Sequence, residues 1–86
     1  MEKLVYQLRV YRDLYLGRNT YLTRAYIGTY HGSRSYSIAD EEAALLKIEN
    51  QISAEGFSLG KLDHFCEILM DTPDIEITPS LVYDLI

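Results

Sequence analysis

The sequence contains no tryptophan, one cysteine and two prolines. The single cysteine, Cys66, excludes a disulfide within the chain, and the two histidines are too few to form a metal site with it unless carboxylates contribute. No apolar run approaches the length of a transmembrane helix, and charged residues are spread through residues 1–17, which is unlike a signal peptide. These absences predict a reducing, cytoplasmic setting, with no metal, no cofactor and no membrane contact.

Basic residues are also scarce in one part of the chain. Residues 37–86 hold two basic and eleven acidic residues, whereas residues 1–36 hold six basic and two acidic residues. Seven of the eight tyrosines also lie in residues 1–36, so the chain has a basic, tyrosine-rich half and an acidic half. With 48% apolar and 24% charged residues, its composition is that of one globular domain over residues 1–86.

The tyrosine-rich half has the alternation expected of a β-sheet. Apolar and polar side chains alternate over residues 3–16, and residues 20–31 are rich in β-branched and aromatic side chains. The turn sequence GRN separates these two segments. Gly32-Ser33 suits a two-residue hairpin loop before a third, short strand at residues 34–38.

The two loops give a consistent strand register. They place Asp13 opposite Arg24, as an opposite-charge cross-strand pair, and Tyr11 opposite Tyr26. The same register gathers aliphatic side chains on the other face of the sheet. We therefore predict a three-stranded antiparallel β-meander over about residues 3–38.

The acidic half has the signals of helices. Ser37 is a candidate N-cap, Gly56 is a candidate C-terminal stop, and acidic residues fill the first turn. A second helix is predicted to start after Ser58 and to end before Pro73. The apolar stripe predicted for the first of these helices is Ala44, Leu45, Ile48 and Ile52.

The last residues predict two short elements. Residues 74–77 read as a short edge strand, and Thr78-Pro79 is a cap followed by a first-turn proline, which favours a helix over residues 80–86. The predicted fold class is therefore α+β: the β-meander, followed by two to three helices packed on one face of it.

One motif matches part of a known family signature. Tyr26-Ile27-Gly28 resembles the second half of the GIY-YIG nuclease signature, and Arg34 follows at a plausible distance for the catalytic arginine of that family. The first half is represented only by the LYL of residues 14–16, which lacks the glycine. The next helix opens with three acidic residues, which would repel phosphate. A GIY-YIG-like nuclease is therefore only a remote alternative.

No other arrangement indicates an enzyme. His64 and Cys66 are two residues apart and would point to different sides of a helix, and no phosphate-binding glycine loop is present. A helix-turn-helix motif at residues 50–65 would place Asp63 and Glu67 on or beside its recognition helix, where they would repel DNA. We therefore predict a protein that is not an enzyme and has no catalytic residues.

The outward face of the predicted β-meander concentrates tyrosine and arginine. These side chains are enriched in protein-interface hot spots, and they also stack bases and pair phosphates in single-stranded nucleic-acid sites. Outer strand faces favour tyrosine without any binding role as well. The candidate binding residues on this face are Arg9, Tyr11, Tyr15, Arg24, Tyr26 and Tyr30.

These observations predict a small non-enzymatic protein-binding module of the inhibitor or adaptor type. Its partner would be another protein, such as a nucleic-acid-handling enzyme. A phage or mobile-element inhibitor, for example an anti-CRISPR protein, is one version, which rests on size and charge class alone. The alternative is a single-stranded nucleic-acid-binding domain that uses the same face, although the two basic and eleven acidic residues of the acidic half, a net charge of −9, disfavour it.

Overall fold

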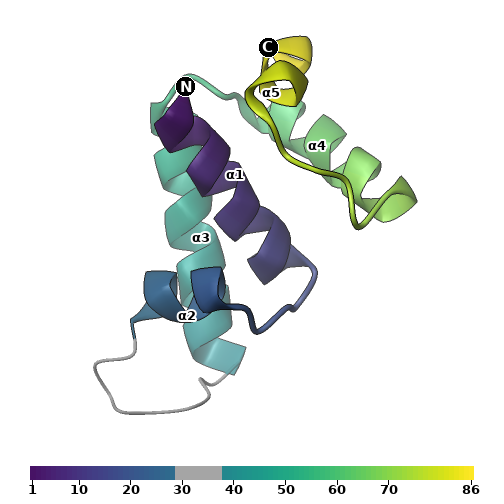
Figure 1. The fold of residues 1–86 in the computed structure, drawn as a ribbon. Coiled ribbons are helices and arrows are strands. Elements are labelled where there is room, and N and C mark those ends of the chain that lie inside the picture. The colour runs from purple at the N-terminus through teal and green to yellow at the C-terminus, as the bar shows by residue number, and fades with distance from the viewer. Residues whose placement is uncertain (29–37) are drawn as a thin grey trace.

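The computed structural model describes residues 1–28 and 38–86, and both ranges contain helices only (Figure 1). The predicted α+β class is therefore wrong, and the three-stranded β-meander predicted over residues 3–38 is absent from the residues that the structure describes. The described helices are α1 (Glu2–Tyr15), α2 (Tyr21–Ile27), α3 (Ile38–Ala54), α4 (Leu59–Asp71) and α5 (Pro79–Leu85).

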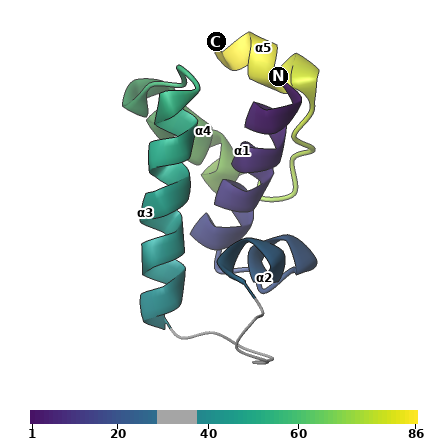
Figure 2. The same ribbon diagram turned by 90° about the vertical axis from the view of Figure 1, so that its left-hand side faces the viewer.

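The arrangement is built around α1. Helices α1 and α3 lie side by side and run in opposite directions, and α2 crosses the end of α1 and contacts both of them (Figures 1 and 2). Helix α5 packs against the N-terminal part of α1. None of the described helices combines the length and the apolar character that crossing a lipid bilayer requires.

One apolar core joins α1, α3, α4 and α5. Helix α1 is central to it because side chains on most of its circumference are buried. Burial of this apolar surface is the main favourable term for a chain of this size. The buried apolar residues are Leu4, Val5, Leu8, Val10, Tyr11, Leu14, Ala44, Ile48, Ile52, Phe57, Leu62, Phe65, Leu69, Ile77 and Val82.

Helix α1 lies where the first strand was predicted. The prediction failed because the spacing of the apolar residues in this segment fits both the strand period and the helix period. Leu4 and Leu8 are four residues apart, which places them on one face of a helix and also on one face of a strand. Two residues distinguish the two patterns. A strand would turn Val5 outward and Tyr6 inward with Leu4 and Leu8, but Val5 is 5% exposed and Tyr6 is 43% exposed. The buried set therefore follows the helical period.

The turn sequence GRN ends a helix and does not join two strands. The N–H of Gly17 donates to Leu14 O at 3.1 Å, and the N–H of Arg18 donates to Asp13 O at 2.7 Å, which is the Schellman motif. Gly17 supplies the positive φ of 69° that this motif needs. Glycine marks a turn in either fold, so the sequence signal was real but its structural context was different.

Helix α2 begins with a capping box. Its two threonines, Thr20 and Thr23, are β-branched and therefore also fitted the strand predicted for residues 20–31. Thr20 Oγ1 accepts from the N–H of Thr23 at 3.3 Å, and Thr23 Oγ1 accepts from the N–H of Thr20 at 2.9 Å. The helix ends at Gly28, whose φ is 99°. The Tyr-Ile-Gly sequence is thus a helix C-terminus, and the sheet of the GIY-YIG family has no counterpart in the described residues.

The cross-strand pairs predicted from the register are not formed. Asp13 accepts hydrogen bonds from Arg12 Nε at 2.8 Å and from Thr20 Oγ1 at 2.7 Å. Arg24 donates instead to Asn19 O at 3.2 Å. Asp13 therefore connects the end of α1 to the start of α2, and the charge pairing that the sheet register required does not occur.

The helices predicted in the acidic half are present. Ala44, Ile48 and Ile52 are buried as predicted, and α3 ends in a second Schellman motif, in which Gly56 donates to Ser53 O at 3.0 Å. Ser58 caps α4 by accepting from the N–H of Lys61, and Thr78 caps α5 by accepting from the N–H of Leu81. These caps are local sequence features, so they could be read without knowing the fold.

The predicted edge strand at residues 74–77 is an irregular segment instead. Arg9 of α1 holds it, because its Nε and Nη2 donate to Ile77 O at 3.1 and 2.9 Å. Arg18 holds the other end by donating to Pro73 O at 3.0 Å and to the carboxylate of Asp74 at 2.9 Å. Arginine side chains therefore replace a β-ladder as the means of fixing this segment.

Three further predictions lie outside the described residues. These are the hairpin loop at Gly32-Ser33, the N-cap at Ser37, and the third strand, of which only residue 38 is described and lies in α3.

Candidate functional site

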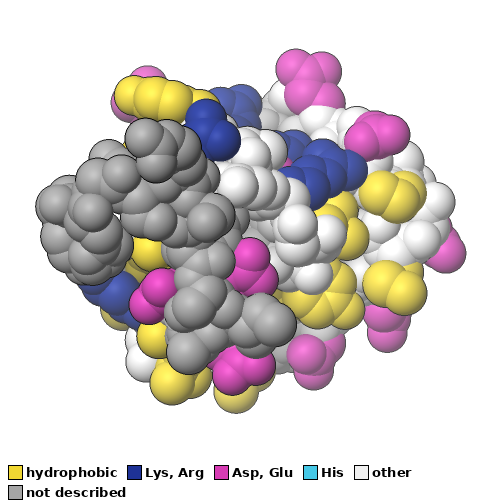
Figure 3. Space-filling view, turned by 90° about the horizontal axis from the view of Figure 1, so that it is seen from below, with side chains coloured by type: hydrophobic (Ala, Val, Ile, Leu, Met, Phe, Trp, Pro, Cys, Tyr) yellow, Lys and Arg dark blue, Asp and Glu magenta, His cyan; other side chains and the backbone are white. Residues whose placement is uncertain are grey.

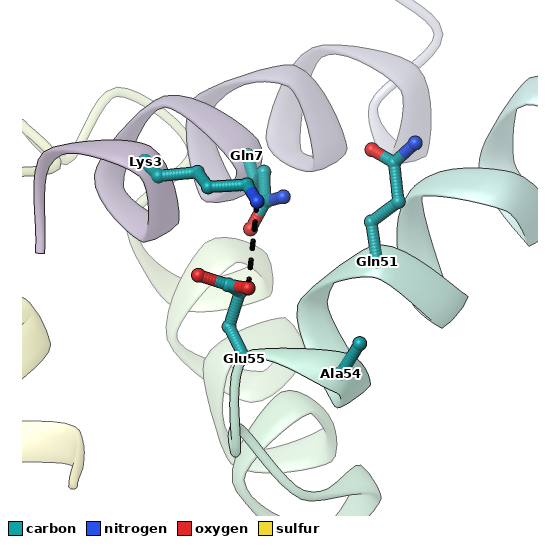
Figure 4. A pocket seen from close by; sticks show the side chains of 5 residues that line it. All are labelled: Lys3, Gln7, Gln51, Ala54 and Glu55. Carbon is teal, nitrogen blue, oxygen red and sulfur yellow. Dashed lines mark ion pairs between the residues drawn. The ribbon is translucent and has the colours of Figure 1, made fainter.

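A pocket lies between the first turns of α1 and the last turns of α3. Its volume is about 230 Å³. Figure 4 shows Lys3 and Gln7 extending from α1 toward the turn that carries Glu55, while Gln51 extends from α3. The lining residues are Lys3, Gln7, Gln51, Ala54 and Glu55.

Helical spacing and antiparallel packing together create this pocket. Lys3 and Gln7 are four residues apart on α1, and Gln51 and Glu55 are four residues apart at the end of α3, so each pair shares one helix face. Because α1 and α3 run in opposite directions, the start of α1 meets the end of α3 (Figure 1). The small side chain of Ala54 leaves space between the two pairs.

An ion pair connects the two sides of the pocket. Lys3 Nζ lies 3.6 Å from Glu55 Oε2, and the two side chains are 70% and 33% exposed. A pair this exposed contributes little to stability, because water and salt screen it. It can exchange one partner for an incoming group at low cost, so it forms an adaptable rim of the pocket.

Gln7 is the unusual residue of the pocket. Its side chain is 4% exposed, and no donor among the described residues reaches its Oε1. A buried polar atom without a hydrogen bond costs about 1–3 kcal/mol, so proteins rarely keep one. Gln7 lines the pocket, but this oxygen is itself buried, so a molecule in the pocket cannot reach it unless neighbouring atoms move.

Tyrosine and lysine side chains extend the surface beside the pocket. Tyr26 Oη donates to Gln51 Oε1 at 3.3 Å, and Lys47 Nζ lies 5.6 Å from the centroid of the Tyr26 ring, a cation–π distance. Burial, and then the nearby Tyr6, raise the pKa of Tyr26. Its hydroxyl therefore stays protonated at neutral pH and remains a donor to Gln51.

We call this surface the α1–α3 face. It consists of the polar pocket residues and the side chains next to them, and it combines two tyrosines, two lysines, two glutamines and one glutamate. Its members are Lys3, Tyr6, Gln7, Tyr26, Lys47, Gln51 and Glu55.

The structure does not bring the sequence-predicted site residues together on one face. Arg9 is occupied by Ile77 O, and Tyr11 lies in the core, where its hydroxyl is 3.1 Å from Cys66 Sγ. Tyr15 stacks on Tyr11 with ring centroids 5.7 Å apart. Since the predicted sheet is absent from the described residues, these side chains share no common outward surface.

The remaining candidates separate in the same way. Arg24 donates to the backbone of its own helix start at Asn19, and Tyr26 alone belongs to the α1–α3 face. Tyr30 lies outside the described residues. Of the predicted set, Tyr26 is therefore the residue that the structure places beside a pocket.

Sequence reasoning missed Gln7, although one signal was present. Read as a strand, residues 3–16 turn Gln7 outward as an ordinary polar residue. Read as a helix, the same residues place it four after Lys3 and between the core residues Leu4, Leu8 and Tyr11. A glutamine among apolar neighbours at helical spacing would have marked a buried amide.

The described residues contain no group of three or more histidine, cysteine or acidic side chains that could hold a metal ion. His64 Nδ1 lies 3.7 Å from Glu67 Oε2, and both side chains are exposed. Cys66 contacts Tyr11, and burial is the main cause that raises the pKa of that tyrosine. Tyr11 therefore stays neutral and does not act as a base toward the thiol.

No protein-family model matches the chain, no curated protein is similar enough to count as a relative, and no solved structure matches it. The function therefore has to be argued from the residues themselves.

Proposed function

We propose that this chain is a small non-enzymatic module of the cytoplasm that binds another protein through its α1–α3 face. The observation that supports this most is the joint presence of Tyr6 and Tyr26 beside a pocket that charged and amide side chains line. Tyrosine is enriched at interfaces because it offers a large contact area together with a hydroxyl. Pockets that receive a side chain of the partner are typical of the centre of such interfaces.

Some side chains of the α1–α3 face contribute little to the stability of the isolated chain and could contribute more in a complex. Tyr6 is 43% exposed, and the Oε1 of Gln7 lacks a partner, so neither contributes fully to the stability of the isolated chain. A partner that covers Tyr6 would gain the contribution of its exposed ring. The binding energy would then come from groups that the fold leaves incompletely used.

Protein is the better partner class because the arginines have internal roles. Arg9 and Arg18 donate to residues 73–77, and Arg12 donates to Asp13. On the face seen in Figure 3, Lys and Arg side chains occur in small separate groups among Asp and Glu side chains. A nucleic-acid backbone requires a continuous basic track, so this face favours a protein partner over single-stranded nucleic acid.

An inhibitor or adaptor is the type of protein that this size and surface fit. One specific version is an inhibitor of a nucleic-acid-handling enzyme encoded by a phage or mobile element, such as an anti-CRISPR protein. Its support is the small size and the net charge of −5, which would favour a basic partner through complementary potential.

The test is a co-purification from the source cells with tagged chains. We expect the wild type to capture a partner, and Tyr6→Ala with Tyr26→Ala to lose it, since truncated interface tyrosines often cost about 2 kcal/mol or more. Met70→Ala is the matched control, because Met70 is also exposed but lies on α4, which contributes nothing to the pocket. Circular dichroism checks that each variant is folded. Equal capture by the folded double variant would contradict the proposal.

A further inference from the structure

Helix α4 exposes two large apolar side chains, one near each of its ends. Leu59 and Met70 are 65% and 69% exposed. Their positions in the sequence correspond to about three helical turns, so the two side chains lie on one line along α4, about 16 Å apart. The half-buried Cys66 lies on the same line between them. We call these three residues the α4 row.

An aromatic ring of α1 lies beside the middle of the α4 row. The Tyr11 hydroxyl is 3.1 Å from Cys66 Sγ, and Tyr15 stacks on Tyr11 with ring centroids 5.7 Å apart. The Cys66 thiol is also the main cause that raises the pKa of Tyr15, so these two side chains are neighbours. The Tyr15 ring is 38% exposed. Single exposed apolar residues are ordinary, but an aligned set beside an aromatic ring is typical of a contact surface.

Acidic side chains border the α4 row on its outer side. Asp63, Glu67 and Asp71 follow one another at intervals of four residues, so they form a line on the same side of the helix, and all three are exposed. Among the described residues, no lysine or arginine forms an ion pair with any of them. On the right of Figure 3, where α4 ends, hydrophobic and acidic side chains lie side by side.

The charge of this part of the molecule selects the class of partner. Residues 57–86 hold one basic and six acidic residues, a net charge of −5, whereas residues 1–56 hold seven of each. The whole net charge of the chain therefore belongs to the part that carries α4 and α5. A negative potential repels nucleic acid, an anionic membrane surface and a second copy of the same face, and it attracts a cationic partner.

We infer that the outer face of α4 binds a basic amphipathic helix of a partner protein. The apolar side chains of that helix would cover Leu59, Met70 and Tyr15. Its lysine or arginine side chains would lie against the bordering carboxylates, such as those of Asp63 and Glu67. A helix of about three turns matches the length of the α4 row. The α4 row shares no residue with the α1–α3 face, so it is a second contact surface and does not depend on the first.

The test uses three labelled peptides. The first, acetyl-KALKKLAKALKKLA-amide, is basic and amphipathic as a helix; in the second, glutamate replaces every lysine, and in the third, serine replaces every leucine. Fluorescence anisotropy at low salt gives the affinities. We expect saturable binding of the first peptide, roughly tenfold or more weaker binding of the third, and none of the second. Equal affinity of the first peptide and either of the others would overturn the inference.

Amide chemical shifts and an apolar variant locate the bound peptide. In the wild-type chain we expect the largest shifts in residues 59–71. Leu59→Ser with Met70→Ser should weaken binding by roughly tenfold or more, because these side chains would be covered only in the complex. Leu46→Ser is the matched control, since Leu46 is 61% exposed and lies on α3. Largest shifts elsewhere, or full affinity of the double variant when circular dichroism shows that it is folded, would overturn the inference.

A second pair of variants tests the bordering carboxylates. Asp63→Asn with Glu67→Gln should weaken binding of the basic peptide by roughly tenfold at low salt and should make the affinity less dependent on salt. Glu41→Gln with Glu42→Gln is the matched control, because it changes the net charge by the same amount in the first turns of α3. An equal loss of affinity in both chains would show a general attraction between opposite charges, and the α4 site would be wrong.

Two further results separate this inference from the proposed function and from self-association. Tyr6→Ala with Tyr26→Ala changes only the α1–α3 face, so this chain should bind the basic peptide as the wild type does. Met70→Ala should weaken the peptide and leave capture through the α1–α3 face unchanged. Each surface can therefore fail without the other. A dimer of the chain that Leu59→Ser with Met70→Ser abolishes would assign the α4 row to a second copy and would overturn the inference.

Discussion

Asp13 connects two helices through a carboxylate that is 2% exposed. It accepts from Arg12 Nε and from Thr20 Oγ1, and Thr20 in turn caps α2. A buried carboxylate is tolerated only when it is hydrogen-bonded in this way. The predicted strand register paired Asp13 with Arg24. That pairing was wrong because the sequence spacing of two opposite charges does not show whether they lie on paired strands or near a helix end.

The first prediction concerns this carboxylate. Asp13→Ala leaves Arg12 and Thr20 without their acceptor, and we expect it to lower the free energy of unfolding by about 1.5–3 kcal/mol, the range for hydrogen bonds to charged groups. Denaturant unfolding followed by circular dichroism measures the change. Asp74→Ala is the comparison, since its pair with Arg18 is 92% exposed on the Asp74 side and should matter much less. Equal effects of the two substitutions would contradict the role assigned to Asp13.

The second prediction concerns the buried phenol of Tyr11, which should make the protein less stable in alkaline solution. Burial, followed by its hydrogen bond to Cys66, raises the pKa of Tyr11 above the ordinary tyrosine value of about 10. The folded state therefore favours the neutral phenol, and this contribution is complete below about pH 10 and is lost as the pH rises further. Tyr11→Phe has no proton to lose, so its stability should fall less steeply above pH 10.

The measurement is the free energy of unfolding of both chains at a series of pH values. At neutral pH the Tyr11→Phe substitution should cost about 1 kcal/mol or less, the value of one hydrogen bond. Tyr21→Phe is the matched control, because the Tyr21 ring is 77% exposed. If Tyr11→Phe and the wild type decline in parallel, the buried phenol is not the cause of the alkaline loss.

At the scale of the element, two glycines end helices by taking a conformation that other residues avoid. Gly17 and Gly56 have φ values of 69° and 88°, and an added Cβ would meet nothing within 4 Å at either position. Steric contact with neighbours is thus not what requires glycine. The requirement is the left-handed backbone of the two Schellman motifs.

The third prediction separates these glycines from Gly60. Gly17→Ala and Gly56→Ala should each lower the free energy of unfolding by about 1–2 kcal/mol, the cost of the left-handed conformation. Gly60 lies in the first turn of α4, and an added Cβ would be 3.9 Å from Ser58 Oγ, an ordinary contact. Gly60→Ala should therefore stabilise the chain by up to about 1 kcal/mol. Thermal unfolding of the three variants gives the signs, and destabilisation by Gly60→Ala would contradict this account.

How far an element could be predicted depended on whether its signals were local. The caps Ser58 and Thr78, and the glycine that ends α3, each act within one helical turn, so the sequence identified those helices. Helix α1 was ambiguous because Leu4 and Leu8 satisfy both periods, and which of Val5 and Tyr6 is buried depends on the rest of the fold. Tertiary packing decided it.

The candidate site was even less predictable than the fold. Its pocket exists only because the start of α1 meets the end of α3, a contact between residues about 50 positions apart that no local pattern encodes. Tyr26 was selected for its residue type and lies at the edge of the face. Gln7 was passed over, since an unpartnered buried atom is a property of the packed structure and not of the sequence.

At the scale of the whole molecule, the positive charges of the arginines are used in contacts within the fold. The chain carries a net charge of −5, and the four arginines of residues 1–28 donate to its own backbone or carboxylates. Arg9 and Arg18 fix residues 73–77 to the remainder of the fold. These arginines therefore have a role in holding the fold together, in addition to the positive charge that they give to the surface.

The last prediction follows from this distribution and tests the nucleic-acid alternative. We expect no saturable binding of a labelled single-stranded oligonucleotide at micromolar protein and low salt, where screening is weakest and any phosphate contact would be strongest. Arg9 and Arg18 already use donors on Ile77 O and on the Asp74 carboxylate, and the net negative charge would repel the strand. Fluorescence anisotropy measures the binding. Affinity in the micromolar range that falls steeply with added salt, and that is lost in Arg24→Ala, would restore a nucleic-acid partner and displace the protein interface proposed for the α1–α3 face.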